Sequence, residues 1–206
     1  MRSSWFSVLG SQFSVLLRLL ITSMPMRFPH AEQLALPCRF ERIVPGALHA
    51  DGRRYLPLLV LRPTHGGLLG ALALGVVDRH HVVAPDLAGC DGIARLVFLL
   101  SSIRLQSPPY QAGLFAEAGH TPERPSTRPH AYGQVVDVLT WEAERVQLPY
   151  EALYTELLLD IGIGTVGVRT SMTAPDLAVA LGTAQIRPGD WLAVERSRID
   201  ILGFDV

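Results

Sequence analysis

Alternating apolar and polar positions divide the carboxyl-terminal half of the chain into short strands separated by turn residues. The strands predicted by this pattern cover residues 132–141, 153–160, 165–170, 191–194 and 198–204. Gly162 and Gly164 supply the turn between the second and third strands. A short helix is predicted from 173 or 174 to 181, because Thr173 can cap it, Pro175 suits its first turn and Gly182 follows its end. This half is therefore expected to be mostly β, with the last strand closing the unit.

The same order of elements recurs in the amino-terminal half. The string Ala-Pro-Asp-Leu-Ala occupies 84–88 and again 174–178, followed in both places by Gly and Ala at the same spacing. Upstream, 70–76 aligns with 162–168, and 55–59 aligns with 154–158. Three matches in the same order indicate a tandem duplication of one small β-rich module. The proline-rich stretch between the copies is interpreted as a linker or a long loop.

Five strands with a helix between the third and the fourth is the element order of the OB-fold. The carboxyl-terminal copy resembles nucleic-acid-binding OB domains, such as those of replication protein A and the anticodon-binding domains of synthetases. The segments that carry the resemblance are Tyr-Gly-Gln-Val-Val-Asp-Val at 132–138, Leu-Asp-Ile-Gly-Ile-Gly-Thr-Val-Gly-Val at 159–168 and Arg-Pro-Gly-Asp-Trp-Leu-Ala-Val at 187–194. The amino-terminal copy lacks the Pro-Gly-Asp turn and the glycine before its first strand, so its barrel is expected to be degenerate. The resemblance implies an all-β fold with short helices, built as two tandem OB-like five-stranded barrels.

The domain division that follows is an amino-terminal extension at 1–37, a first module at 38–106, the linker or loop at 107–129 and a second module at 130–206. Residues 5–24 are rich in apolar side chains, but serines, Gln12 and Arg18 interrupt them. That stretch is poor both as a membrane span and as a secretory signal. We interpret it as an extension that precedes a start at Met24 or Met26 and that is not native to the fold.

Charge is distributed unevenly, although the formal net charge is only −1. Between 38 and 105 there are eight arginines and five acids, whereas between 130 and 206 there are five arginines and eleven acids. If the chain binds single-stranded nucleic acid, phosphate contacts and base stacking are therefore expected from Arg53, Arg54 and Arg62 around Tyr55. The candidates in the second copy are Trp141, Arg169, Arg196 and Arg198. The alternatives are that 51–54 is only a solvated turn, and that aromatic residues in the strands, such as Trp191, belong to the core.

Residue chemistry gives no sign of catalysis. Cys38 and Cys90 form no CxxC pair, the seven histidines lie outside ligand spacing, and no phosphate loop or nucleophile motif occurs. The repeated Asp86 and Asp176 are interpreted as capping or turn residues rather than as a pair of acid–base groups. No metal, no cofactor and no membrane partner is expected, and two isolated cysteines fit a reducing cytoplasm.

The leading hypothesis is a cytoplasmic, non-enzymatic protein that binds single-stranded DNA or RNA or assists a complex that does. The alternative is a protein-interaction scaffold without nucleic-acid affinity, docking through its acidic second copy. A third hypothesis, an enzyme that uses a cleft between the copies, would need a convergent polar pocket that the sequence cannot supply.

Overall fold

The computed structural model describes residues 28, 30–64, 72–99, 102–121, 123–140, 155–195 and 197–206. The expectation of an all-β fold is confirmed, because these residues form mostly strands joined in one continuous eleven-stranded sheet. The strands are β1 (Leu36–Val44), β2 (Leu58–Pro63), β3 (Leu74–Val77), β4 (Asp91–Leu99), β5 (Ser102–Leu105), β6 (Gly113–Phe115), β7 (His130–Thr140), β8 (Thr155–Asp160), β9 (Thr165–Arg169), β10 (Trp191–Glu195) and β11 (Arg198–Asp205). The described helical segments are η1 (Ala31–Gln33), η3 (Pro85–Leu87) and α2 (Ala174–Ala180).

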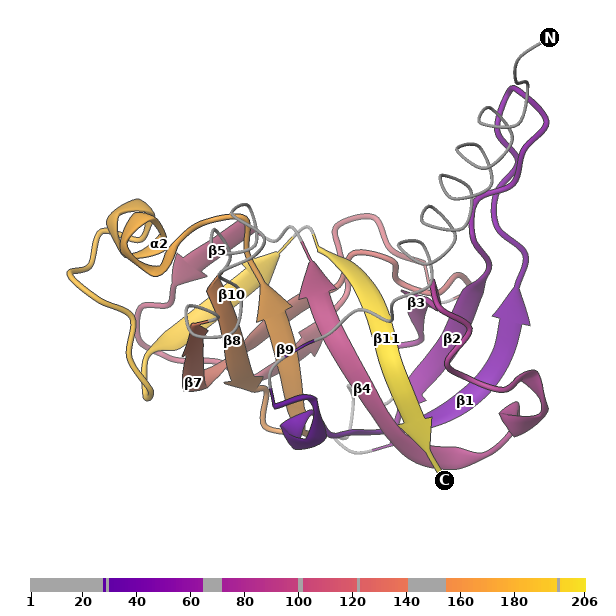
Figure 1. The fold of residues 1–206 in the computed structure, drawn as a ribbon, viewed down its shortest axis with the longest axis horizontal. Helices are drawn as coiled ribbons and strands as arrows, with labels where there is room; N and C mark the ends of the chain where they lie inside the picture. Colours follow the sequence, from indigo (N-terminus) through magenta and orange to yellow (C-terminus); the bar gives the residue numbers. More distant parts are fainter. Residues whose placement is uncertain are drawn as a thin grey trace, which may run out of the picture.

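Five of the strands close into a barrel (Figure 1). β1 pairs antiparallel with both β2 and β4, and β2 pairs antiparallel with β3. β11 completes the barrel, lying parallel to β3 on one side and antiparallel to β4 on the other. Closure leaves the barrel without an open edge, so every one of its strands has hydrogen-bonded neighbours on both sides.

The remaining strands extend the same sheet. β7 pairs with β8 and with β10, and β8 pairs with β9, which repeats the pairing of β1 with β2 and β4 and of β2 with β3. β9 also pairs in parallel with β4, so the two groups of strands share one sheet. Within the described ranges β5 pairs with β10 but not with β9. A second closed barrel is therefore not confirmed.

The observed pairing of the last strand, β11, differs from the expected one. Residues 198–204 were expected to close the carboxyl-terminal copy, but β11 lies in the barrel formed by β1 to β4. β5, which follows β4 in the chain, pairs instead with β10, in the other group of strands. The alternation of apolar residues marks 198–205 as a strand with one buried face, but it carries no information about which sheet that face joins.

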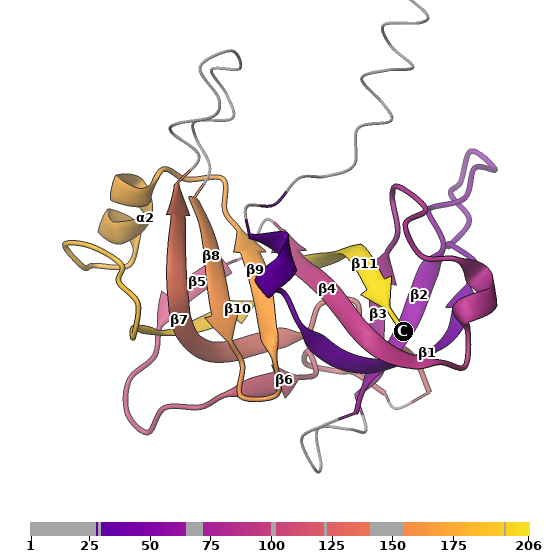
Figure 2. The same ribbon diagram turned by 60° about the horizontal axis from the view of Figure 1, so that its bottom comes forward.

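Two layers of apolar side chains pack against the sheet. The larger core fills the inside and runs continuously from the barrel to β7 and β10. A smaller cluster lies on the outside, where η1 covers β4, β8 and β9 (Figure 2). Phe28 and Leu34 are buried there, and a Cβ at Gly167 would come within 2.7 Å of the Phe28 ring. Phe28, Leu34 and Leu36, which the sequence assigned to the extension, thus pack into the fold.

The repeated Ala-Pro-Asp-Leu-Ala string forms a helical turn after the third strand of each copy. In α2 the Asp176 N–H donates to Thr173 Oγ1 over 3.3 Å, and that hydroxyl donates to the Asp176 carboxylate over 2.7 Å. Gly182 follows the helix with φ +69°. The predicted cap at Thr173 is therefore confirmed, and Asp176 takes part in it. In the first copy the string forms only the 3-10 turn η3, without a side-chain cap.

The proline-rich connection packs along the barrel. Ser126 is buried, its N–H donates to the Ala73 carbonyl, and its own carbonyl accepts from the Gly75 N–H, both over 2.7 Å. Pro125 and Thr127 lie so close to Gly75 that a Cβ there would come within 3.4 Å and 3.0 Å of them. This connection therefore pairs with β3 through its backbone and covers the outward side of that strand at Gly75.

The two free cysteines differ in burial, which allows a simple chemical check. Cys38 lies in the core, and burial raises the pKa of its thiol to about 12. Because the thiolate is the reactive form, we expect a disulfide reagent to modify the partly exposed Cys90 and to leave Cys38 unmodified until the protein unfolds. The check is the stoichiometry of labelling with and without denaturant, with Cys90→Ser as the control. Rapid labelling of native Cys90→Ser would contradict the burial of Cys38.

Candidate nucleic-acid interface

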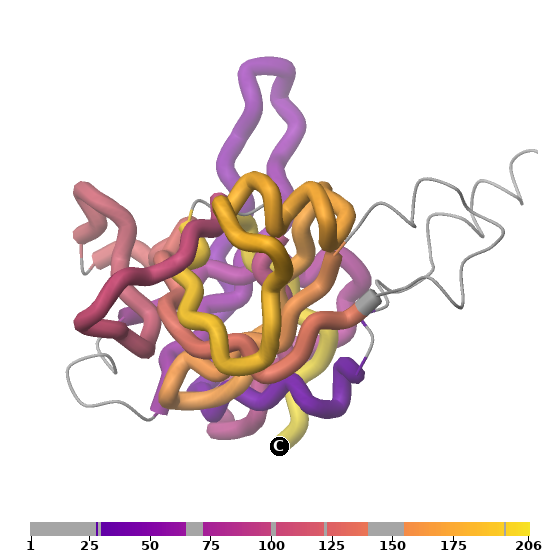
Figure 3. Tube along the Cα trace, turned by 90° about the vertical axis from the view of Figure 1, so that its left-hand side faces the viewer, coloured from indigo at the N-terminus to yellow at the C-terminus, as the bar shows by residue number. Residues whose placement is uncertain are grey.

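A two-stranded arm, residues 45–57, joins β1 to β2 and projects from one end of the barrel. It is the purple pair of segments above β1 and β2 in Figure 1 and the purple loop at the top of Figure 3. Backbone bonds hold its two sides together, with the His49 N–H 2.6 Å from the Arg53 carbonyl and the Tyr55 N–H 2.9 Å from the Ala47 carbonyl. Asp51 and Gly52, at φ +81°, make the turn at the tip. The arm is thus an ordered ribbon rather than a loose loop.

The arm presents basic and aromatic groups to solvent. The Tyr55 ring is stacked on the His49 ring, with centroids 3.6 Å apart, and Tyr55 is 58% exposed. Arg53 is exposed, and its only described ionic partner is Asp51, 3.9 Å away on the same turn. Arg54 donates to the Gly46 carbonyl over 3.2 Å. Three of the residues predicted to bind nucleic acid therefore lie together on this arm.

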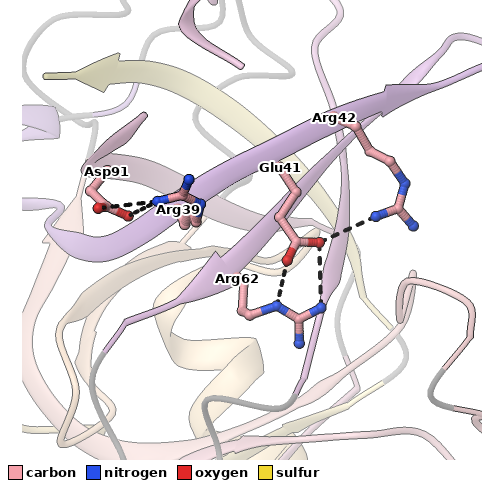
Figure 4. A network of polar contacts seen from close by, with 5 residues as sticks. All are labelled: Arg39, Glu41, Arg42, Arg62 and Asp91. Carbon is pink, nitrogen blue, oxygen red and sulfur yellow. Dashed lines mark hydrogen bonds and ion pairs between the residues drawn. The ribbon is translucent and has the colours of Figure 1, made fainter. Parts of the chain in front are cut away.

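Arg62 lies apart from the arm, on the outer face of the β1–β2 pair (Figure 4). Its guanidinium contacts Glu41 over 2.5 Å and 3.4 Å, and Arg42 reaches the same carboxylate over 3.3 Å. Arg39, directly opposite Arg62 in register, pairs with Asp91 over 3.4 Å. This face carries three arginines whose charge two carboxylates partly offset.

Strand register places further residues at the arm end of the barrel. Val44 pairs with Leu58, Leu58 with Val77, and Val77 with Asp200. The base of the arm, the end of β3 and the start of β11 therefore lie side by side. This brings Arg198 to the same end as Arg53, Arg54 and Tyr55.

Arg79 also lies at this end, and the sequence reasoning did not single it out. It lies two residues after the end of β3 and pairs with Asp200, the partner of Arg198. Nothing in the local sequence distinguishes Arg79 from an ordinary turn arginine, because its partner is more than a hundred residues away. The pairing of β11 with β3 brings Arg79 and Asp200 together.

Arg169 lies two strands from Arg198 in the sheet, since Leu99 of β4 pairs with both residues. Its guanidinium forms an ion pair with Glu156, whose side chain is fully buried. Arg169 therefore has a structural role as the partner of a buried carboxylate. The other two predicted residues, Trp141 and Arg196, lie outside the described residues.

Aromatic side chains on the other half of the sheet contact other side chains of the protein. Trp191 lies on the outer side of β10 and is stacked on Tyr110, with centroids 5.3 Å apart. Arg104 sits over the Tyr132 ring at 5.9 Å and bonds Glu195 over 3.0 Å. The hydrogen bond from Arg104 lowers the pKa of the Glu195 carboxyl and outweighs the opposing effect of its burial. Trp191 therefore lies outside the core, and the Tyr110 ring covers part of its surface.

Comparison with known proteins adds no assignment, because no family model, no curated protein and no solved structure matches this chain. In the described part of the chain, no three or more histidine, cysteine, aspartate or glutamate side chains gather as a metal ion would require. No helix among the described residues is long and apolar enough to cross a membrane.

Proposed function

We propose that this chain is a non-enzymatic protein with OB-like architecture that binds single-stranded DNA or RNA at the arm end of its closed barrel. The strand order of the barrel, with η3 between its third and fourth strands and β11 as the fifth, supports the OB-like part. The loop between the first and second strands is one of the binding elements of that fold. Here that loop is the arm.

The observation that carries the proposal is the pairing of exposed arginines with a stacked ring pair on the arm. Single-stranded nucleic acid is bound without sequence preference by aromatic platforms beside positive charge. Arg53 and Arg54 supply the charge, and the exposed face of Tyr55 supplies the platform. Because Pro125 and Thr127 cover β3 at Gly75, we place the bound strand at the arm end rather than across the outer face of β3.

Fluorescence anisotropy with a labelled mixed-sequence oligonucleotide tests this site. We expect binding at low salt, and we expect Arg53→Ala and Arg54→Ala each to weaken it and to lower the salt slope by about 0.7. Replacing Tyr55 by leucine should cost about 1–3 kcal/mol of binding free energy per stacked base. The control is Arg95→Ala, which removes an arginine paired with Asp205 at the opposite end of the barrel.

Two results would reject the proposal. One is the absence of binding by the native chain at low salt. The other is binding that stays the same in both arginine variants and in the tyrosine variant. A loss of affinity equal to that of Arg95→Ala would mean a general electrostatic effect rather than a site on the arm.

A second candidate function, docking to a protein, follows from a different property of the arm. Leu48 is 61% exposed and Leu56 is 41% exposed, and such side chains bind protein surfaces more readily than phosphates. A photoreactive residue at 48 should then crosslink one defined protein in cells, while the same residue at the exposed Val206 should not. If crosslinking persists when Leu56→Ser and Tyr55→Ser are added, docking through the arm is wrong.

We also propose a cytoplasmic location. The support is that both cysteines are free thiols, which persist most readily in a reducing compartment.

A further inference from the structure

Two arginines share one buried carboxylate at the arm end of the barrel. Asp200 is only 2% exposed, and its two oxygens accept hydrogen bonds from Arg198 over 2.7 Å and 3.1 Å. The Nε of Arg79 lies 3.8 Å from the same carboxylate. The side chains of Arg79 and Arg198 are 48% and 41% exposed. Two positive charges are thus held at the surface by one negative charge beneath them.

Both arginines are anchored by ordered backbone. Arg198 begins β11, where Asp200 pairs with Val77 of β3. Arg79 lies in the turn after β3, and the buried Asp78 holds that turn by accepting the N–H groups of Val82 and Val83 over 2.9 Å and 3.0 Å. Preorganised side chains lose less conformational entropy when they bind a ligand than mobile ones do.

Both guanidinium groups keep N–H donors that Asp200 does not engage. Asp200 engages Nε and Nη2 of Arg198, and no described residue is hydrogen-bonded to its Nη1. Among the residues that the structure describes, no acceptor lies within hydrogen-bonding distance of Arg79. Planar guanidinium groups bind phosphate oxygens through paired N–H donors.

We propose that Arg79 and Arg198 form a binding site for a phosphate group. Resting on the proposed function, the group is a phosphodiester of the strand whose bases contact the arm, because both lie at the same end of the barrel. The carboxylate of Asp200 positions the two guanidinium groups and does not itself contact the anion.

Arg79→Gln is the informative variant, because Asp200 keeps both hydrogen bonds from Arg198 and the fold is retained, as an unchanged Tm would verify. The matched control is Arg95→Gln, which also removes an arginine from an ion pair with an aspartate of β11. Two probes are used: inorganic phosphate, followed through the NMR signals of the arginine Nε–H groups, and a labelled oligonucleotide, followed by anisotropy.

We expect phosphate to shift the Arg79 and Arg198 signals in a saturable way in the native chain and in Arg95→Gln. Arg79→Gln should lose the response at Arg198 and bind the oligonucleotide several-fold more weakly, with a salt slope lower by about 0.7. If phosphate shifts neither signal and Arg79→Gln binds the oligonucleotide normally, the anion site is wrong and the proposed function stands. If phosphate binds but the native chain does not bind the oligonucleotide, the site holds free phosphate and the proposed function is wrong.

Discussion

Deleting residues 198–206 is expected to unfold the closed barrel although its other four strands remain in the chain. β11 places Ile199, Ile201 and Phe204 in the core of that barrel. Burying each such side chain contributes about 1.5–3 kcal/mol, and a whole domain is stable by only about 5–15 kcal/mol. The deletion also leaves the β4 edge without its partner. Thermal unfolding followed by circular dichroism should show the loss of the cooperative transition.

Amide hydrogen exchange distinguishes the observed arrangement, with β11 in the barrel of β1 to β4, from one in which β11 pairs with the strands of the carboxyl-terminal half. With β11 in the first barrel, its deletion should remove amide protection from β1, β2 and β3 before that of β7 and β8. If β11 closed the carboxyl-terminal copy, the order would be reversed, and such a result would contradict the observed pairing of β11. Deleting only the exposed Val206 is the control and should leave both groups of amides protected.

Replacing Arg169 by alanine is expected to lower the free energy of unfolding by about 3–5 kcal/mol, because it removes one partner of a buried ion pair. Glu156 is fully buried on β8, directly opposite Arg169 on β9. Urea denaturation measures the change. Arg95→Ala breaks an exposed pair and should cost only about 0–1 kcal/mol.

A paired replacement distinguishes loss of the ion pair from loss of packing. Glu156→Met combined with Arg169→Met removes both charges, and such exchanges of buried pairs by apolar residues are often neutral or stabilising. The double variant should therefore recover most of the stability that Arg169→Ala loses. Equal losses in Arg169→Ala and Arg95→Ala would show that Glu156 does not depend on Arg169. A change in the nucleic-acid affinity of Arg169→Ala is interpreted only under conditions in which this variant is as fully folded as the native chain.

Local signals in the sequence predicted the elements of the carboxyl-terminal copy closely. The hairpin predicted at 153–160 and 165–170 is β8 and β9, and the helix predicted up to 181 is α2. Asp160 accepts the Gly162 N–H over 2.8 Å in the turn between the two strands. Caps, glycine turns and side-chain alternation act over a few residues, so they can be recognised without knowledge of the fold.

The candidate site was predicted only where it is local. Arg53, Arg54 and Tyr55 are neighbours in the sequence. The short turn before them, which was recognised in the sequence, also forms the tip of the arm. Arg62 belongs to the adjoining face, where Glu41 holds it. Arg79 could not have been found, because it lies near Arg198 only through the pairing of β11 with β3.

The amino-acid sequence by itself determined which segments are strands, where they turn and which of their faces are apolar. Tertiary structure alone decided which strands are neighbours, because the same alternation would let β5 or β11 pair with either group of strands in the sheet. That choice depends on long-range packing of Ile199, Ile201 and Phe204 against β4 and its barrel, which no local pattern encodes. The charge balance of each copy was likewise readable from composition. The pairing of two arginines with Asp200, and with it the proposed anion site, depends on the pairing of β11 with β3.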